Sequence, residues 1–462
     1  MKKAQIEISP VMEKLSTYIA GAIKRPLPPP VVERAKVSLV DTYAAIISGS
    51  RLLPGKRALA YVRTLGGKPV ASVFGTRIVT SVPNAAFANG MLAHADETDD
   101  THPATRTHPG SGVVPAVMAI GERDRLSGTA VLRAMVLGYD ICTRIILAIN
   151  DLHFRHTGHN PSIMGRLFGA AAASGALVKL DKRQVRHLLS YTAQQAGGLN
   201  CVLRDPEHIE KSFLSGKPAY NGVTAALVVE QGFTGVEDVF SGKHNFFSTF
   251  APPAAFAPEG DRAQLTRGLG SDYEIMRGGV KRWSVGGPNQ APMHVLYELI
   301  RRHGFTADDV QKLVLRMPAR NLLTVDNREM ANVCVQHLLA VMLLDGTMTF
   351  RTSHDYGRMK DPGVLALREK IEAVGEPEPP SAVRSWRCSM EITLKDGRRL
   401  TSQTTAAKGT FENPMTRQDE EEKALDLIGP VLGRRRAREL VAALWDFDRV
   451  NDVRSLRKLV SA

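Results

Sequence analysis

Long apolar runs are missing from this chain of 462 residues. No stretch of about 18 or more uncharged apolar residues occurs, which excludes a membrane-spanning helix. The N-terminal residues include lysines but lack the apolar core of a signal peptide, so we expect none. The four cysteines stand far apart, at 142, 201, 334 and 388. Their spacing argues against a disulfide framework and a cysteine-held metal or iron–sulfur cluster. A cytoplasmic, reducing location fits this pattern best.

Phosphate-binding motifs are also missing. The sequence contains neither G-x-x-x-x-G-K-[ST] nor a GxGxxG between a strand and a helix. Basic residues, in contrast, are in excess: 60 Lys and Arg against 47 Asp and Glu give a net charge of +13, which attracts anions. The one dense basic run, 434–438, leads into a helical pattern typical of a solvated helix face. No nucleic-acid motif accompanies it. Small polycarboxylates explain the charge at least as well, and we expect no nucleic-acid partner.

Helical patterns dominate the chain up to about residue 265. Residues 38–47 form a largely apolar helical stretch, and 112–122 predict a helix with Pro115 in its first turn. Residues 129–149 are apolar on nearly every face, which predicts a buried central helix. Residues 166–180 are rich in glycine and alanine, which permits close approach between helices.

Strand patterns appear only in the later part of the chain. Residues 312–317 alternate as a strand does, and 386–405 predict a hairpin that turns at Asp396-Gly397. Helical segments are expected at 292–302 and 330–345, and helices resume after residue 412. The length favours two domains. We therefore predict a mainly α fold with an inserted α+β domain. The all-helical large domain would comprise 1–268 and 410–462, and the smaller α+β lid domain 269–409.

Residues 94–110, HADETDDTHPATRTHPG, concentrate chemically active side chains. They include four carboxylates, three histidines and one arginine: Asp96, Glu97, Asp99, Asp100, His94, His102, His108 and Arg106. Two prolines and a glycine restrict the backbone, so these groups can be held in place. Histidine titrates near neutrality, as acid–base catalysis requires. We interpret the segment as half of an active site. The alternative is a capped turn in which Asp99, Asp100 and Thr101 bond backbone amides.

A second histidine cluster comprises His153, His156 and His159. Their spacing of three invites a metal site, but such sites usually include a carboxylate or thiolate. Breakers at 158 and 160–161 make a regular helix doubtful, so His159 alone is the better candidate. Lys211 and Lys281 stand among glycines and prolines and suit the binding of a carboxylate or enolate. Solvated surface lysines are the alternative.

In order along the chain, these motifs resemble the MmgE/PrpD family. The resemblance covers nearly the whole sequence. It rests on segments 94–102, 108–110, 137–140, 159–172, 211–222, 281–284, 343–346 and 412–416. The family includes 2-methylcitrate dehydratase, cis-aconitate decarboxylase and iminodisuccinate epimerase.

The resemblance implies a homodimeric, cofactor-free and metal-independent enzyme that binds a di- or tricarboxylate between a helical domain and a lid. By position it implies six catalytic residues: Glu97, Thr101, His108, His159, Lys211 and Lys281. We expect Arg106 to clamp a substrate carboxylate, and Asp100, His102 and His337 to contribute to substrate binding.

Five positions depart from the family pattern. Glu97 replaces aspartate, Leu214 a histidine and His337 a tyrosine. Gly286 stands at a position that is often cysteine or histidine, and Gln290 at one that is often histidine. Several of these line the pocket that the resemblance implies, so the substrate can differ from that of better-known family members.

The favoured hypothesis is a lyase, a dehydratase or decarboxylase that transfers a proton next to a carboxylate. An epimerase of a small dicarboxylate is the second hypothesis. A metal-dependent hydratase and a non-catalytic binding protein remain further alternatives.

Overall fold

The computed structural model describes residues 7–149, 158–205, 207–250, 261–378 and 386–462. They form two compact units. The helical unit is drawn from Met1–Ala95, Asp99–Gly278 and Leu427–Ala462, and the α+β unit from Asp96–Thr98 and Gly279–Asp426. The expected limits were 268/269 and 409/410, whereas the units change at 278/279 and 426/427. Nothing in the sequence indicates that three residues near position 97 belong to the later unit.

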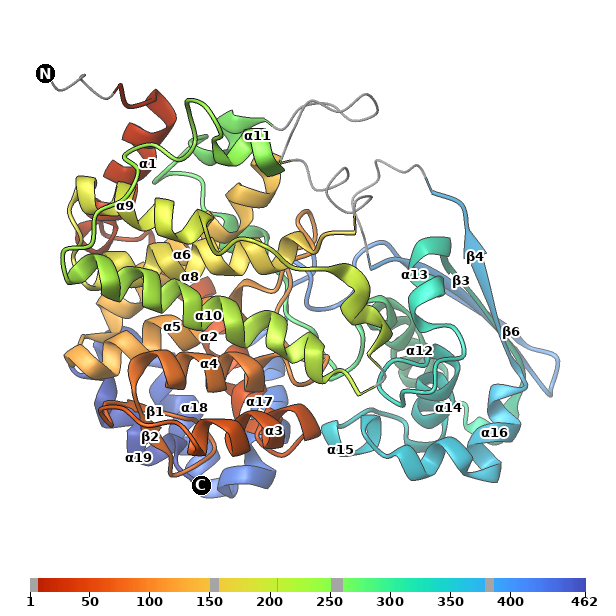
Figure 1. Ribbon diagram of the computed structural model, residues 1–462. Coiled ribbons are helices and arrows are strands. Elements are labelled where there is room, and N and C mark those ends of the chain that lie inside the picture. Colours follow the sequence, from red (N-terminus) through yellow and green to blue (C-terminus); the bar gives the residue numbers. More distant parts are fainter. Residues whose placement is uncertain (1–6, 150–157, 206, 251–260, 379–385) are drawn as a thin grey trace, which may run out of the picture. The chain divides into compact units, whose positions relative to one another are not determined.

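Helices are the main regular secondary structure of the helical unit (Figure 1). They are α1 (Pro10–Gly21), α2 (Pro29–Gly49), α3 (Leu53–Arg63), α4 (Val82–Ala93), α5 (Pro109–Asp124), α6 (Gly128–Ile149), α8 (Pro161–Leu177), α9 (Lys182–Ala193), α10 (Ile209–Glu230), α11 (Phe246–Phe250), α18 (Arg434–Trp445) and α19 (Arg457–Val460). The unit also holds a small antiparallel pair, β1 (Ala71–Ser72) and β2 (Val79–Thr80). The expectation of an all-helical domain is thus corrected by one short ladder.

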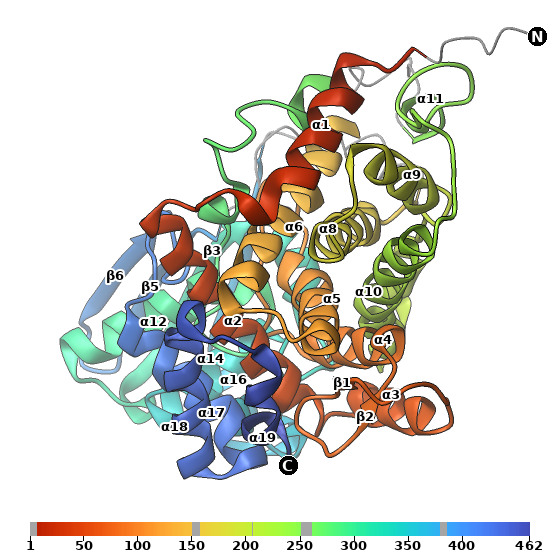
Figure 2. The same cartoon turned by 90° about the vertical axis from the view of Figure 1, so that its left-hand side faces the viewer.

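Helix α8 packs against α5, α6 and α10 in the centre of this unit (Figure 2). The predicted buried helix at 129–149 is confirmed by α6, most of whose side chains are buried. Glycine allows α8 to approach α6 closely, since a Cβ on Gly169 would lie 2.5 Å from the Gly138 carbonyl oxygen. Side chains from α6, α8, α9 and α10 form the core there, and an aromatic group around Phe168 and Phe246 extends it.

The expected start of α5 was wrong. The helix begins at Pro109 rather than at Gly112, so Pro115 lies inside it. Proline at the first helical position costs no hydrogen bond. The sequence signal for this start was therefore His108-Pro109, three residues earlier than expected.

The α+β unit is built on a four-stranded sheet in the order β4-β3-β5-β6. Its strands are β3 (Val310–Pro318), β4 (Ile371–Glu376), β5 (Cys388–Leu394) and β6 (Arg399–Thr404). The predicted hairpin is confirmed, because β5 and β6 pair antiparallel around a turn with Gly397 at φ 88°. Strand β4, which pairs parallel with β3, was not predicted.

The helices of this unit are α12 (Gln290–His303), α13 (Ala319–Val325), α14 (Val335–Asp345), α15 (Phe350–Ser353), α16 (Pro362–Arg368) and the first part of α17 (Arg417–Leu432). Alternation along β3 buries Leu313, Leu315 and Met317 against a core shared with α12 and α14. Lys312 and Arg316 are exposed. The mainly α fold class with a smaller α+β part is confirmed. Among the described residues, no helix combines the length and apolar character needed to cross a membrane.

Candidate active site

The acid-rich segment between α4 and α5 folds into a tight turn. The His102 amide donates to the Thr107 carbonyl at 2.9 Å, and the Arg106 amide donates to the His102 carbonyl at 2.8 Å. Arg106 has φ 54°, in the left-handed region that few non-glycine residues adopt. This turn leaves Arg106 half-buried at its tip. Its proposed binding of a substrate carboxylate stays a prediction.

His108 is held at the start of α5 with a defined tautomer. Its Nδ1 lies 2.6 Å from the backbone carbonyl oxygen of Asp100. A carbonyl oxygen can only accept, so Nδ1 carries a hydrogen. In the neutral ring Nε2 then carries the lone pair, which is the form that a general base requires. His108 is half-buried, so this atom is compatible with proton transfer to a substrate.

A buried carboxylate, Asp99, contacts two imidazoles. Its Oδ2 lies 2.7 Å from Nδ1 of His94 and 3.5 Å from Nδ1 of His108. The two rings are 4.9 Å apart between centroids. Burial lowers the pKa of His94 well below its usual value, and the charges of Lys211 and Arg166 lower it further, against the opposing effect of Asp99. His94 is therefore neutral near pH 7. We did not select His94 and Asp99 as site residues, although both belong to the segment that we singled out.

The same three side chains are the group of described residues best able to hold a metal ion. Their donor atoms all lie within 4.8 Å of one another. Because His108 donates through Nδ1 to Asp100, only its Nε2 is suited to coordination. This arrangement suits proton transfer at Nε2 at least as well. Of the histidine cluster considered as a metal site, His153 and His156 lie outside the described residues.

Asp100 supports the beginning of α5. Its carboxylate accepts from the Gly110 amide at 3.1 Å and from the Tyr139 hydroxyl at 2.6 Å. Burial raises the pKa of Asp100 to about 7; nearby Asp41 and Asp99 add to this rise, and the Tyr139 hydrogen bond opposes it. These contacts fix the backbone from which His108 projects.

His102 is fully enclosed. Its Nδ1 lies 3.0 Å from Thr105 Oγ1, and its Nε2 lies 3.3 Å from a Glu274 carboxylate oxygen. The contacts of Asp100 and His102 are those of residues that shape the turn, and their roles in substrate binding stay predictions. Thr101, between them, is half-buried.

Lys211 lies in the first turn of α10, in the electrostatic neighbourhood of His94. The adjacent Ser212 hydroxyl donates to the His94 carbonyl at 3.1 Å. Helices α4 and α10 can approach this closely because glycines face each other. A Cβ on Gly90 would lie 2.9 Å from the Gly216 Cα. The structure thus brings Lys211 to the group formed by His94, Asp99 and His108.

His159 stands immediately before α8. It forms an isolated bridge with Leu199, and its carbonyl oxygen accepts from the Asn200 side chain at 2.6 Å. Its side chain is half-buried. The backbone is thus fixed at this position, and the catalytic role of His159 stays a prediction.

The α+β unit carries a second group of candidate residues. Lys281 Nζ lies 3.9 Å from Glu97 Oε2, and the lysine side chain is only 1% exposed, against 16% for Glu97. Thr98, next to Glu97, accepts from the Ser284 hydroxyl at 3.1 Å. Its carbonyl also accepts from Lys423 Nζ at 3.0 Å. Two residues predicted from distant parts of the sequence, Glu97 and Lys281, are therefore neighbours.

Comparison with known sequences divides the chain near the junction at 278/279. The profile of the MmgE/PrpD N-terminal domain matches residues 13–259, and that of the MmgE/PrpD C-terminal domain matches residues 283–447. The chain belongs to the MmgE/PrpD family. Human cis-aconitate decarboxylase is 27% identical over 435 residues, which cover 89% of this chain and 86% of the relative.

Two further relatives extend over nearly the whole chain. Mouse cis-aconitate decarboxylase is 24% identical, with 97% of this chain and 93% of the relative covered. A cis-aconitate decarboxylase-like protein of Aspergillus oryzae is 23% identical, with 98% and 97% covered. The chain is an enzyme of the lyase type, as its family membership and these relatives show.

One of the departures from the MmgE/PrpD pattern, Gln290, has a structural explanation. Gln290 is fully buried and bonds to the backbone of the segment that follows Lys281. Its oxygen accepts from the amides of Arg282 and Trp283, and its nitrogen donates to the carbonyls of Trp283 and Val285. Leu214 is buried and its backbone carbonyl accepts from Arg166 at 2.8 Å; any residue could make that bond, and nothing in the structure explains the leucine side chain.

The other departures change the space and polarity of the α+β unit. A Cβ on Gly286 would meet no atom closer than 3.5 Å, so the glycine leaves room. His337 is fully buried on α14, and burial lowers its pKa to about 4, with smaller contributions from Arg368 and Arg358. Among the described residues, neither of its ring nitrogens has a hydrogen-bond partner. A neutral imidazole thus stands where the family usually has tyrosine.

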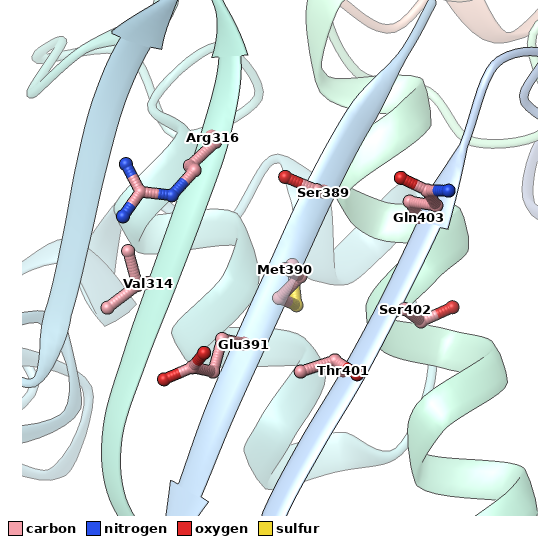
Figure 3. A pocket seen from close by; sticks show the side chains of 8 residues that line it. All are labelled: Val314, Arg316, Ser389, Met390, Glu391, Thr401, Ser402 and Gln403. Carbon is pink, nitrogen blue, oxygen red and sulfur yellow. The ribbon is translucent and has the colours of Figure 1, made fainter.

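A hollow of about 380 Å³ lies on the open face of the four-stranded sheet (Figure 3). It is lined by residues of β3, β5 and β6, among them Arg316, Glu391 and Gln403. None of the predicted site residues lines it. The shape of the surface therefore does not identify the groups that suit acid–base chemistry.

Proposed function

We propose that this protein is a cofactor-independent decarboxylase of cis-aconitate or of a closely similar tricarboxylate. The observation that carries the proposal is that three relatives aligned over most of the chain all bear the name cis-aconitate decarboxylase or cis-aconitate decarboxylase-like protein. The acid–base and cationic groups described above support it, because the substrate is a trianion whose reaction consumes a proton.

The reaction balances without an oxidant or a second substrate. The bond to one carboxylate breaks, and CO₂ leaves. The electron pair forms a new carbon–carbon double bond, the old double bond opens, and its far carbon takes up one proton. The product is a five-carbon unsaturated dicarboxylate. The enzyme must supply that proton and stabilise the negative charge that accumulates on the remaining carboxylates.

Roles for individual side chains follow from their contacts. His108, with Nδ1 fixed on the Asp100 carbonyl, would take up a proton at Nε2 from solvent and deliver it from there to the substrate carbon. Lys211 and Lys281 would neutralise substrate carboxylates, as compact point charges do well. Glu97, 3.9 Å from Lys281, would orient that lysine and take part in the proton balance.

The test uses purified full-length protein and proton NMR in heavy water. With cis-aconitate we expect CO₂ release and one solvent deuterium in each product molecule. His108→Gln should abolish both, whereas His294→Gln, a change at a half-buried histidine of α12 to which no role is assigned, should leave them unchanged.

A panel of citrate, 2-methylcitrate and amino- or iminodicarboxylates separates the alternatives. Dehydration without CO₂ release would favour a dehydratase, and deuterium exchange with unchanged carbon skeleton would favour an epimerase. Binding of these acids with neither turnover nor exchange would refute the acid–base proposal.

A further inference from the structure

Asp96, the residue before Glu97, forms a buried polar cluster within the α+β unit. Its Oδ1 lies 2.7 Å from Nε2 of His354 and accepts from the Asn332 side chain at 2.9 Å. Asp96 is 4% exposed and Asn332 5%. His354 follows α15 directly. We selected neither His354 nor Asn332 from the sequence, since nothing near them along the chain suggests chemistry.

The contacts of His354 define its protonation state. Its Nδ1 lies 2.8 Å from the Phe350 carbonyl oxygen and its Nε2 faces the Asp96 carboxylate. Both oxygens can accept from the ring nitrogens, an arrangement that favours the doubly protonated, cationic ring. Burial lowers the pKa of His354, but the Asp96 charge and the two hydrogen bonds raise it more, to above the usual value. Asp96, which is buried, and His354, which is half-buried, thus form an ion pair.

Both neighbours of Glu97 are anchored, and Glu97 itself is the accessible member. Asp96 is held by His354 and Asn332, and Thr98 by Ser284 and Lys423. Asp96 and Thr98 are buried, whereas Glu97 is half-buried. Fixing the residues on both sides restricts the backbone of Glu97. A glutamate is longer than the aspartate of the family pattern and loses more side-chain conformational entropy when its carboxylate is fixed. Anchoring the residues on both sides therefore matters more for Glu97 than for an aspartate.

We propose that His354 is a positioning residue for Glu97: through its ion pair with Asp96 it fixes the segment 96–98 and balances the charge beside the Glu97 carboxylate. The inference rests on the proposed function only in that Glu97 takes part in turnover. Without the His354 cation, a buried Asp96 anion would stand next to Glu97. A neighbouring negative charge favours proton binding by a carboxylate. As the pH is lowered, Glu97 would therefore become protonated at a higher pH than in the wild type.

Both positively and negatively charged groups surround the Asp96–His354 pair and Glu97. Lys281 faces Glu97 and Lys423 bonds the Thr98 carbonyl. On α17, Asp426 accepts from the Phe350 amide at 2.7 Å and interacts with His354. The Tyr356 hydroxyl lies in the field of Asp96. All of these groups are retained in the variants below, so differences between variants report the pair itself.

The experiment compares pH–rate profiles of the wild type, His354→Asn, and the double variant His354→Asn/Asp96→Asn. In His354→Asn we expect turnover to fall about tenfold with KM changed less than about threefold, as for a group that orients a catalytic residue. The acidic limb should shift upward by about one pH unit. In the double variant the uncompensated charge is gone, and the limb should return to the wild-type position although turnover stays low. The matched control, His294→Asn, changes a half-buried histidine in the same unit and should have the wild-type profile.

Nitrogen-15 NMR of the histidines gives a readout that needs no substrate. In the wild type, His354 should show two protonated nitrogens at neutral pH. As the pH is raised, His354 should lose one of these protons at a lower pH in Asp96→Asn than in the wild type. If His354 has only one proton in the wild type, or if both variants keep the wild-type limb, the proposal is overturned.

Failure of the proposed function looks different. In that case the wild type fails to release CO₂ while the NMR signature persists. The profiles are then measured with whichever acid of the panel turns over, or by calorimetric binding of that acid across pH if none does. An unchanged pH dependence of binding in His354→Asn would again overturn the role assigned to His354.

Discussion

Asp100→Asn is expected to stabilise the protein above neutral pH and to leave its stability little changed below pH 4. The carboxylate accepts from the Gly110 amide and the Tyr139 hydroxyl. An asparagine oxygen can accept from Gly110, and its NH₂ can donate to the tyrosine oxygen. The substitution therefore keeps both contacts and removes only the ability to ionise.

The magnitude follows from the pKa of Asp100, which burial raises from 3.8 to about 7. Between these values the folded state binds a proton that the unfolded state has released, so stability falls as pH rises. A difference of one pH unit between the folded and unfolded pKa values is worth about 1.4 kcal/mol, and the full effect is of the order of 4 kcal/mol. Asparagine lacks this slope. The difference in unfolding free energy, variant minus wild type, should therefore grow from about pH 4 to pH 7 and stay level above it.

Urea unfolding followed by circular dichroism at 222 nm measures this difference, because the helical unit dominates the signal. Other titrating groups are common to both proteins and cancel in the difference. Asp140→Asn is a matched comparison: burial raises the pKa of Asp140 to about 7 as well, and it also accepts from a tyrosine, Tyr18. A difference for Asp100→Asn that is flat or falls with pH would refute the reasoning, because Asp100 would then be ionised at ordinary pH.

Three further predictions concern the proposed chemistry. Lys281→Met should lower turnover at least about 100-fold with an unchanged melting temperature, and Lys312→Met, at an exposed position of the sheet, should leave the rate unchanged. Gly216→Ala places a Cβ 2.8 Å from the Phe87 carbonyl oxygen. This substitution should lower the free energy of unfolding by about 1–3 kcal/mol and slow turnover by moving α10. Gly429→Ala, with open space around the added Cβ, should do neither. Exhaustive chelation should leave the rate of CO₂ release intact, and stoichiometric metal in elemental analysis, with activity lost on its removal, would instead assign the histidine–carboxylate group to a metal site.

Local patterns predicted several elements because their causes are local. The apolar faces of α6 and the Asp396-Gly397 turn of the β5–β6 hairpin each contain their own signal. The start of α5 also has a local signal, Pro109 at its first position, and the Asp100 carboxylate adds a hydrogen bond to the Gly110 amide. Strand β4 has no clear alternation, with only Ile371 fully buried, and it is a strand because β3 pairs with it. Such non-local causes leave little trace in the sequence.

The same distinction separates the predicted site residues from those that were missed. Glu97 and Lys281 were selected by position from the resemblance to the MmgE/PrpD family, and they are neighbours. His354 and Gln290 were not selected as site residues, because their roles depend on partners that the fold supplies. Gln290 bonds several backbone groups that follow Lys281, and His354 pairs with Asp96 across more than 250 positions. Chemistry concentrated in one segment is visible in a sequence, but support from distant residues is not.

The departures from the family pattern are unevenly divided between the two units. The acid–base residues that match the pattern, including His108, belong to the helical unit, where Asp99 and the Asp100 carbonyl fix their geometry. Four of the five departures, Glu97, Gly286, Gln290 and His337, belong to the α+β unit, and Leu214 is the exception. A change of substrate requires different contacts but the same proton transfer. If the proposed function holds, this division predicts that exchanges at the departing positions of the α+β unit change which acid turns over, whereas exchange of His108 stops turnover of every acid.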